Sequence, residues 1–173
     1  MVKLSIIGGA LIGLSLSSVA VAAEPTVKNW AAPVARIYAQ KLSDETMTAH
    51  ADLLSVTFHG VPPGMNDVYT MFAGSFPERI GNPDDPDDID VSKRGITIID
   101  PRWHRTNDIS PKFVVLMPLR DAAGGNIGLV VYAFKVPIAD DRYGQTLYLK
   151  ALELRDALAQ QIPAYAALFA PAP

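Results

Sequence analysis

The sequence contains few residue combinations that carry out covalent chemistry. It has no cysteine, and it lacks the Gly-x-Ser-x-Gly nucleophile elbow, the P-loop and the glycine fingerprint of dinucleotide-binding folds. A catalytic nucleophile needs a base held beside it, and no such pair stands out along the chain. The carboxylates cluster where a helix cap explains them. We therefore expect a protein that is not an enzyme and that carries no cofactor.

Side chains that bind small molecules are better represented. The candidates are Thr57, His59, Tyr69, Arg79 and Trp103. An arginine can hold a carboxylate through two parallel hydrogen bonds, and tyrosine and tryptophan supply apolar walls and stacking surfaces. Each candidate also has a structural interpretation: His59 could bond the backbone of a turn, Arg79 could pair with nearby acidic residues, and Trp103 could fill the core. Tyr69 could simply be a strand residue, since strands favour tyrosine.

The sequence predicts no metal site. His50 and His104 have no partner at metal-ligand spacing. The acidic run Asp84–Asp90 is the other candidate, but it lacks the glycine and the glutamate that an EF-hand loop needs at its sixth and twelfth positions. We therefore expect this run to cap a helix and to bind no calcium.

A short helix is predicted directly after that acidic run. Asp85 is a good N-cap, and Pro86 fits the first helical position. Lys93 and Arg94 suit the negative end of the helix, and Gly95 is typical of the residue that ends it. These residues predict a helix from Pro86 to Arg94 with Asp85 as its cap.

The central elements that must position these side chains are two apolar runs, Phe113–Leu119 and Ile127–Lys135. Between them, residues 120–126 include Asp121, Gly124, Gly125 and Asn126, which favour a chain reversal. The runs are short and rich in valine, phenylalanine and other strand formers, so they predict an antiparallel hairpin. Neither run alternates apolar and polar residues, which indicates that both faces of the sheet are covered.

An earlier strand, Leu53–His59, has two different faces. One face carries Leu54, Val56 and Phe58, and the other carries Ser55, Thr57 and His59. A second strand is predicted at Asp67–Ala73 and a third at Ile96–Ile99. A polar strand face inside a covered sheet is typical of a ligand cavity. We therefore expect a small ligand between this face and a cover that carries Arg79 and Trp103.

Helices are predicted at both ends of the domain. The first would be capped by Asn29, with Pro33 in its first turn and a stripe of Val34, Ile37, Tyr38 and Leu42. The last would be capped by Asp140 or Asp141, with Pro163 ending or kinking it, and its apolar stripe is Leu147, Ala151, Leu154, Leu158 and Ile162. The order of elements predicts one α+β domain on an antiparallel sheet.

The first residues have the layout of a secretory signal peptide. Lys3 gives a basic start, Leu4–Leu16 an apolar core, and small residues before position 24 give a cleavage site. The alternative, a membrane-anchoring helix, needs a longer apolar core. We therefore expect residues 1–23 to be a signal peptide cleaved after Ala22 or Ala23, and the mature protein to be periplasmic.

The remaining residues, 24–173, are enough for a single domain with its own core. The whole chain has 15 basic and 18 acidic residues, and loss of Lys3 would make the mature part more acidic. An acidic chain without a Lys/Arg cluster is a poor partner for nucleic acid or anionic lipid. We expect neither partner, and the mature chain has no second apolar run long enough to span a membrane.

Three segments in this order resemble the extracytoplasmic Cache (PDC) sensor domains, which have a PAS-like five-stranded sheet. His59–Gly64 resembles the reversal after the first strand, and Arg79–Ile89 resembles the loop-and-helix cover. Met117–Gly124, continued by Asn126–Gly128, resembles the central hairpin. Together with the element order, the resemblance extends over nearly the whole mature chain.

The resemblance implies a PAS/Cache-like five-stranded antiparallel sheet with long N- and C-terminal helices and a loop-helix cover. It also implies a small-molecule cavity between sheet and cover, in a stand-alone soluble sensor domain without its own output module. A membrane receptor or transporter is the expected protein partner. The alternative is a periplasmic accessory subunit that docks on such a receptor without a small ligand, and an exposed apolar patch at Ala164–Phe169 would favour it.

Overall fold

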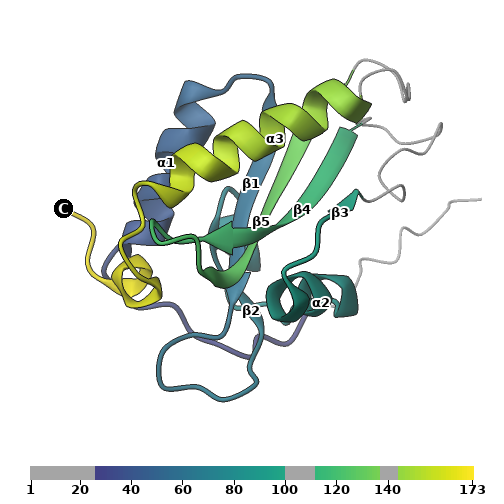
Figure 1. Ribbon diagram of the computed structural model, residues 1–173. Helices are drawn as coiled ribbons and strands as arrows, with labels where there is room; N and C mark the ends of the chain where they lie inside the picture. Colours follow the sequence, from purple (N-terminus) through teal and green to yellow (C-terminus); the bar gives the residue numbers. More distant parts are fainter. Residues whose placement is uncertain (1–25, 100–111, 137–143) are drawn as a thin grey trace, which may run out of the picture.

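The computed structural model describes residues 26–99, 112–136 and 144–173. The predicted signal peptide, Trp103, His104, Asp140 and Asp141 lie outside these ranges. The elements are α1 (Tyr38–Ala49), β1 (Leu53–Gly60), β2 (Thr70–Gly74), the 3₁₀ turn η1 (Pro77–Arg79), α2 (Pro86–Arg94), β3 (Ile98–Ile99), β4 (Lys112–Arg120), β5 (Asn126–Lys135), α3 (Gly144–Ala159) and the 3₁₀ turn η4 (Tyr165–Phe169) (Figure 1).

The five strands form one sheet in the order β2-β1-β5-β4-β3, and every neighbouring pair is antiparallel. The predicted α+β fold with a five-stranded antiparallel sheet is therefore confirmed. The predicted hairpin is also confirmed, because β4 and β5 pair along their whole length, from Lys112 with Lys135 to Arg120 with Asn126. Its turn is held by Asp121, whose Oδ1 accepts the backbone N–H of Gly125 at 2.8 Å.

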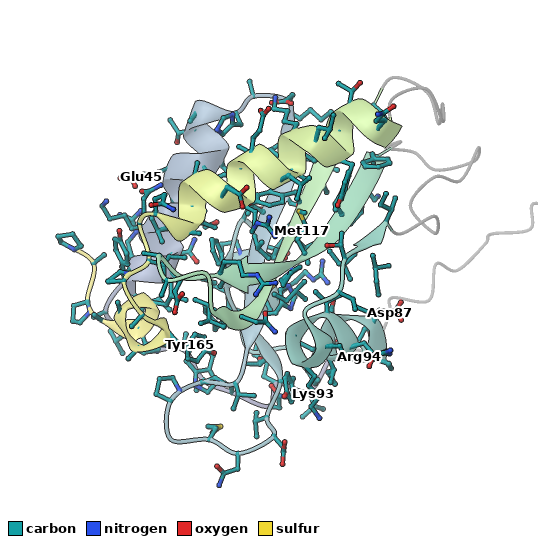
Figure 2. The ribbon with its side chains drawn as sticks, in the orientation of Figure 1. Glu45, Asp87, Lys93, Arg94, Met117 and Tyr165 are labelled. Carbon is teal, nitrogen blue, oxygen red and sulfur yellow. The ribbon has the colours of Figure 1, made fainter. Side chains whose placement is uncertain are left out.

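Both faces of the sheet are covered, as the unbroken apolar runs predict. On one face, α1 and α3 pack over a large core that includes Val56, Phe58 and Met117, and Met117 is fully buried (Figure 2). On the other face, Val91 of α2 packs against a smaller cluster on β4 and β5. The second face is the one that leaves room for a cavity, because only a short helix covers it.

The start of α1 differs from the prediction. The helix begins at Tyr38, after Ile37 in extended geometry, and not near Asn29. Pro33 disfavours helical backbone in the residue before it, and Ile37 forms a bridge with Pro171. Val34, predicted to belong to the apolar stripe, is fully exposed.

The segment before α1 is instead tied to the edge of the fold. The backbone N–H of Asn29 donates to the Gly81 carbonyl at 2.8 Å, and its side-chain amide donates to the Tyr69 carbonyl at 3.0 Å. Gly81 has a φ of 89°, and a Cβ there would lie 2.1 Å from the Trp30 carbonyl oxygen. The close approach of these two backbones therefore requires glycine at position 81.

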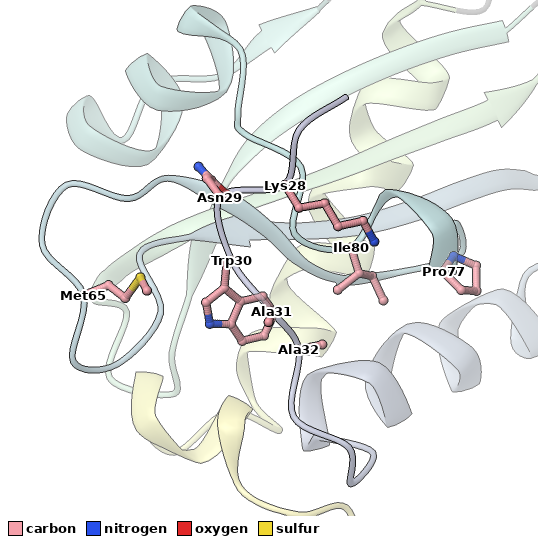
Figure 3. A pocket seen from close by; sticks show the side chains of 8 residues that line it. All are labelled: Lys28, Asn29, Trp30, Ala31, Ala32, Met65, Pro77 and Ile80. Carbon is pink, nitrogen blue, oxygen red and sulfur yellow. The ribbon is translucent and has the colours of Figure 1, made fainter. Parts of the chain in front are cut away.

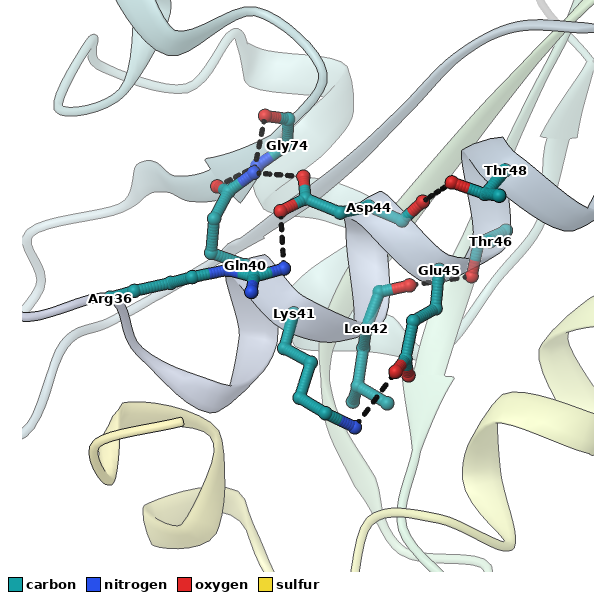
Figure 4. Close-up of polar contacts among 9 residues, drawn as sticks. All are labelled: Arg36, Gln40, Lys41, Leu42, Asp44, Glu45, Thr46, Thr48 and Gly74. Carbon is teal, nitrogen blue, oxygen red and sulfur yellow. Dashed lines mark hydrogen bonds and ion pairs between the residues drawn. The ribbon is translucent and has the colours of Figure 1, made fainter. Parts of the chain in front are cut away.

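The polar side of α1 holds the outer strand β2 in place (Figure 4). The Gln40 amide donates to the Gly74 carbonyl at 3.1 Å and accepts the Gly74 N–H at 3.0 Å. The same amide nitrogen donates to Asp44 at 2.8 Å, and Asp44 also pairs with Arg36. This network satisfies backbone groups at the end of an edge strand, which would otherwise face water or another chain.

The predicted short helix is confirmed as α2. Asp85 is its N-cap, Asp88 accepts the Asp85 backbone N–H at 3.2 Å to complete a capping box, and Gly95 ends the helix with a φ of 64°. The strand predicted at Asp67–Ala73 begins later, at Thr70, because Asp67 adopts a positive φ of 55°. Among the described residues, no helix is both long and apolar enough to cross a membrane.

Candidate ligand-binding site

A cavity of about 210 Å³ lies between the sheet and the cover formed by η1 and α2. Its sheet side is made by Leu54, Ser55, Thr57, His59, Val114, Leu116, Val131 and Ala133. Its cover and rim contribute Phe76, Arg79, Asp85, Asp88 and Lys112. The cavity thus has an apolar floor with charged groups of both signs around it.

Strand β1 turns its polar residues toward this cavity. Thr57 and His59 alternate with Val56 and Phe58, which face the larger core. An irregularity in the pairing with β5 between Leu53 and Ser55 places Leu54 on the cavity side as well. The predicted faces of this strand are therefore right for Ser55–His59 and wrong for Leu54, which was expected on the same face as Val56 and Phe58. A bulge shifts the alternation of faces by one residue at this point.

A chain of hydrogen bonds runs through the buried wall of the cavity. His59 Nε2 lies 2.8 Å from Thr57 Oγ1, and His59 Nδ1 lies 2.7 Å from Asp84 Oδ1. The His59 side chain is 8% exposed and that of Asp84 is 0% exposed. Burial lowers the pKa of His59, but the hydrogen bond and the charge of Asp84 raise it more, so the pKa of His59 lies above its ordinary value. The pair therefore favours a charged imidazolium in a desolvated place.

The backbone around β2 brings Asp84 to this histidine. Thr70 forms a bridge with Pro83, and the Asp84 N–H donates to the Tyr69 carbonyl at 3.2 Å. Residues 81–84 therefore run beside β2, which itself pairs with β1. The side chain of Asp84 reaches His59 because of this pairing.

Asp88 in the first turn of α2 completes the polar group. Its side chain lines the cavity. Burial raises the pKa of Asp88 above its ordinary value, and the negative charge of Asp84 adds to this increase, while His59 acts to lower the pKa. One donor atom each from His59, Asp84 and Asp88 can be chosen so that all three lie within 4.8 Å of one another. Asp84 Oδ2 is buried and has no hydrogen-bond partner among the described residues. This group is a place where a cation or a hydrogen-bond donor would be stabilised.

Arg79 lies at the rim of the same cavity. It is exposed, and its guanidinium carbon lies 5.4 Å from the centre of the Phe76 ring. Within the described part of the chain it makes no ion pair with the acidic residues that follow it. Its donors are therefore available to a ligand, and the structure does not show the alternative pairing that its position in the sequence suggested.

The structure brings together three of the five predicted site residues: Thr57, His59 and Arg79 line one cavity. Tyr69 lies elsewhere. It lines a separate hollow with Gly60 and Tyr165, and Lys93 Nζ sits 5.0 Å from the centre of its ring. Trp103 lies outside the described residues.

Asp84 and Asp88 were missed by the sequence analysis as site residues. Helix capping, which the acidic run predicts, explains Asp85 and one oxygen of Asp88. It does not explain Asp84, which precedes the cap. The position of Asp84, at the start of the acidic run and before the helix cap, was the signal in the sequence that could have indicated a role in the site.

A larger hollow of about 620 Å³ lies at the surface, between the segment before α1 and the loops after β1 and β2 (Figure 3). Trp30, Met65 and Ile80 give it apolar walls, and Lys28 lies at its side. It contains no buried polar group comparable to the His59–Asp84 pair, so the smaller cavity is the stronger candidate for a specific site.

Comparison with known proteins gives a limited result. No protein-family model matches the chain, and no curated protein sequence matches it. The crystal structure of the E. coli DcuS sensor domain is similar, with a TM-score of 0.39 and 18% sequence identity, over 63% of this chain and 71% of that one.

Proposed function

We propose that this chain is an extracytoplasmic sensor-type domain that binds a small molecule in the cavity between α2 and the sheet. The observation that carries the proposal is the buried chain from Thr57 through His59 to Asp84. Burying such polar groups is costly, and proteins tolerate the cost where the groups orient a ligand. The resemblance to Cache domains supports the same location, because it implies a ligand between sheet and cover.

The cavity favours a small, charged organic ligand. Its volume of about 210 Å³ is below the range usual for drug-sized ligands. An anionic group would meet Arg79 at the rim, while an amine would meet Asp88 and the ring of Phe76. The apolar floor on β4 and β5 would contribute burial of the ligand's carbon atoms.

The proposal includes export. Residues 1–23 would be removed as a signal peptide and residues 24–173 would form one periplasmic domain. Its signal would pass to a membrane receptor or transporter.

The alternative is an accessory subunit without a small ligand, and an exposed apolar patch at Ala164–Phe169 would favour it. The contacts of this segment do not support that alternative. Leu168 is fully buried, and Phe169 packs on Phe72 with ring centres 4.8 Å apart. The Tyr165 hydroxyl donates to the Val61 carbonyl at 2.8 Å. The large apolar side chains of this tail therefore pack against the core, and the residues of Ala164–Phe169 that are exposed are the small Ala164 and Ala166.

A thermal-shift screen of residues 24–173 tests the proposal. Amino acids, organic acids, amines and purines would be added in the presence of a chelator, so that metal ions play no part. A ligand at a hundredfold excess over its Kd stabilises the folded state by about 2.7 kcal/mol, which is readily detected.

Substitutions of Arg79 and Asp88 on the cover, with a control at Arg94, test whether the ligand binds in the cavity. For an anionic ligand, Arg79→Ala should weaken binding by about 1.5–3 kcal/mol, the range for hydrogen bonds to a charged group. Arg94→Ala is the matched control, because Arg94 is exposed at the far end of α2 and pairs with Asp90. The proposal fails if no compound shifts the melting temperature, or if an anionic ligand binds both variants as it binds the original chain. A cationic ligand should tolerate Arg79→Ala and should be lost in Asp88→Asn.

A further inference from the structure

His59, Asp84 and Asp88 are residue types that bind metal ions, and their hydrogen bonds leave at least one of their donor atoms without a partner in the described part of the chain. One donor atom from each residue lies within 4.8 Å of the others. In a tetrahedral site with bonds of about 2.0–2.2 Å, neighbouring donors are about 3.3–3.6 Å apart. Side-chain movements of about 1 Å would therefore bring the three donors to one ion.

The buried side chain of Asp84 is a second observation. The Asp84 side chain is 0% exposed, and Oδ1 is bonded to His59 Nδ1 at 2.7 Å. Oδ2 is buried as well and has no hydrogen-bond partner among the described residues. A buried carboxylate oxygen without a partner is costly, and an ion bound to it would remove that cost.

Existing contacts would hold His59 and Asp88 in place around an ion. Thr57 Oγ1 lies 2.8 Å from His59 Nε2 and can accept its proton, and the ion at Nδ1 would replace the proton that Nδ1 now shares with Asp84 Oδ1. Asp88 holds the Asp85 N–H with Oδ2, which leaves Oδ1 available. Partners of this kind fix the tautomer and direction of a metal-binding histidine.

We propose that His59 Nδ1, Asp84 and Asp88 bind one divalent transition-metal ion of the zinc or manganese type. One imidazole and two carboxylates suit such an ion, whereas calcium prefers about six to eight oxygen ligands. His59 and Asp88 also line the cavity, so the remaining coordination positions would face it. The inference goes beyond the proposed function, because the ion would bind with no organic ligand present.

The sequence predicts no metal site here, because metal-binding motifs are recognised by short spacings between their ligands along the chain. His59 and Asp84 are 25 positions apart in the chain, and no spacing rule joins them. His50 is not part of this group, and His104 lies outside the described residues. These two histidines provide the control for non-specific binding.

Calorimetric titration of chelator-treated protein with zinc chloride, repeated with manganese chloride, tests the proposal. We expect about one ion per chain for at least one of the two metals, confirmed by metal analysis after dialysis. Asp88→Asn should weaken binding at least about tenfold. This variant keeps the His59–Asp84 bond, and its amide oxygen can still accept the Asp85 N–H, so it should remain folded by circular dichroism. Asp84→Asn should weaken binding by a similar factor.

Two controls separate this site from the protein surface. Asp90→Asn changes an exposed carboxylate on the same helix, and the double variant His50→Ala, His104→Ala removes the other two histidines. Both should bind the ion as the original chain does. The proposal is overturned if the original chain binds neither metal, if Asp88→Asn binds as well as the original chain, or if the double variant loses binding. None of these results bears on the organic ligand, because that screen is run in chelator.

Discussion

Replacing Asp84 by asparagine should change both the stability of the protein and the sign of its pH dependence. The substitution keeps the shape of the side chain and removes its charge. His59 then loses its charge-assisted hydrogen bond at 2.7 Å in a place where both side chains are almost fully buried. Burial, the largest influence on the pKa of His59, acts to lower it. With Asp84 neutralised, burial prevails and the pKa of His59 should fall below its ordinary value.

The expected cost depends on pH. At pH 6 the original chain holds a charged pair, and removing one partner should cost about 1.5–3 kcal/mol. As pH rises above 6.5 the loss should become smaller, because the imidazolium gradually gives up its proton and the bond then joins a neutral imidazole to the carboxylate. In the original chain the pKa of His59 is raised, so its contribution is fully present below the unfolded pKa near 6.5 and is lost as pH rises through the folded pKa. In the variant the sign reverses, and stability falls as pH drops below about 6.5.

Urea unfolding in chelator at several values between pH 5.5 and 8.5 would measure both effects. Asp90→Asn is the control: it makes the same chemical change on an exposed carboxylate, and its curve should follow that of the original chain. The reasoning is refuted if the difference in unfolding free energy between Asp84→Asn and the original chain is the same at pH 6 and pH 8.5. It is also refuted if that difference grows with pH.

Three further predictions concern other parts of the chain. Asp85→Ala should lower the unfolding free energy by about 1 kcal/mol through loss of the α2 cap, measured by urea unfolding, while calcium should leave the melting temperature unchanged in both forms. Tyr132→Phe should raise stability by about 1 kcal/mol, because the Tyr132 hydroxyl is buried without a hydrogen-bond partner among the described residues; a loss of stability would mean that the hydroxyl is satisfied. Mass spectrometry of the exported protein should find a chain that begins at Ala23 or Glu24, and an intact Met1 would contradict the signal peptide.

Elements whose signals are local could be predicted from the sequence. The β4–β5 hairpin follows from its apolar runs and from Asp121, which bonds the backbone of its own turn. Helix α2 follows from Asp85, Pro86 and Gly95, because caps act within one turn of the helix.

Features that depend on distant contacts could not be predicted. Pro33 is compatible with the first turn of a helix, but α1 begins after Ile37, which pairs with Pro171 near the other end of the chain. The partnership of His59 and Asp84 likewise depends on the bridge between Thr70 and Pro83. For this reason the sequence located the polar strand face correctly but missed the carboxylates that complete the site.

The central claim is that a small molecule binds between α2 and the sheet. The most direct test is a crystal structure of residues 24–173 with the tightest ligand from the thermal-shift screen. We predict electron density for the ligand in the cavity, with polar contacts to His59 and to Arg79 or Asp88. Ligand density elsewhere, for example in the hollow beside Trp30, with the cavity closed by its own side chains, would contradict the claim.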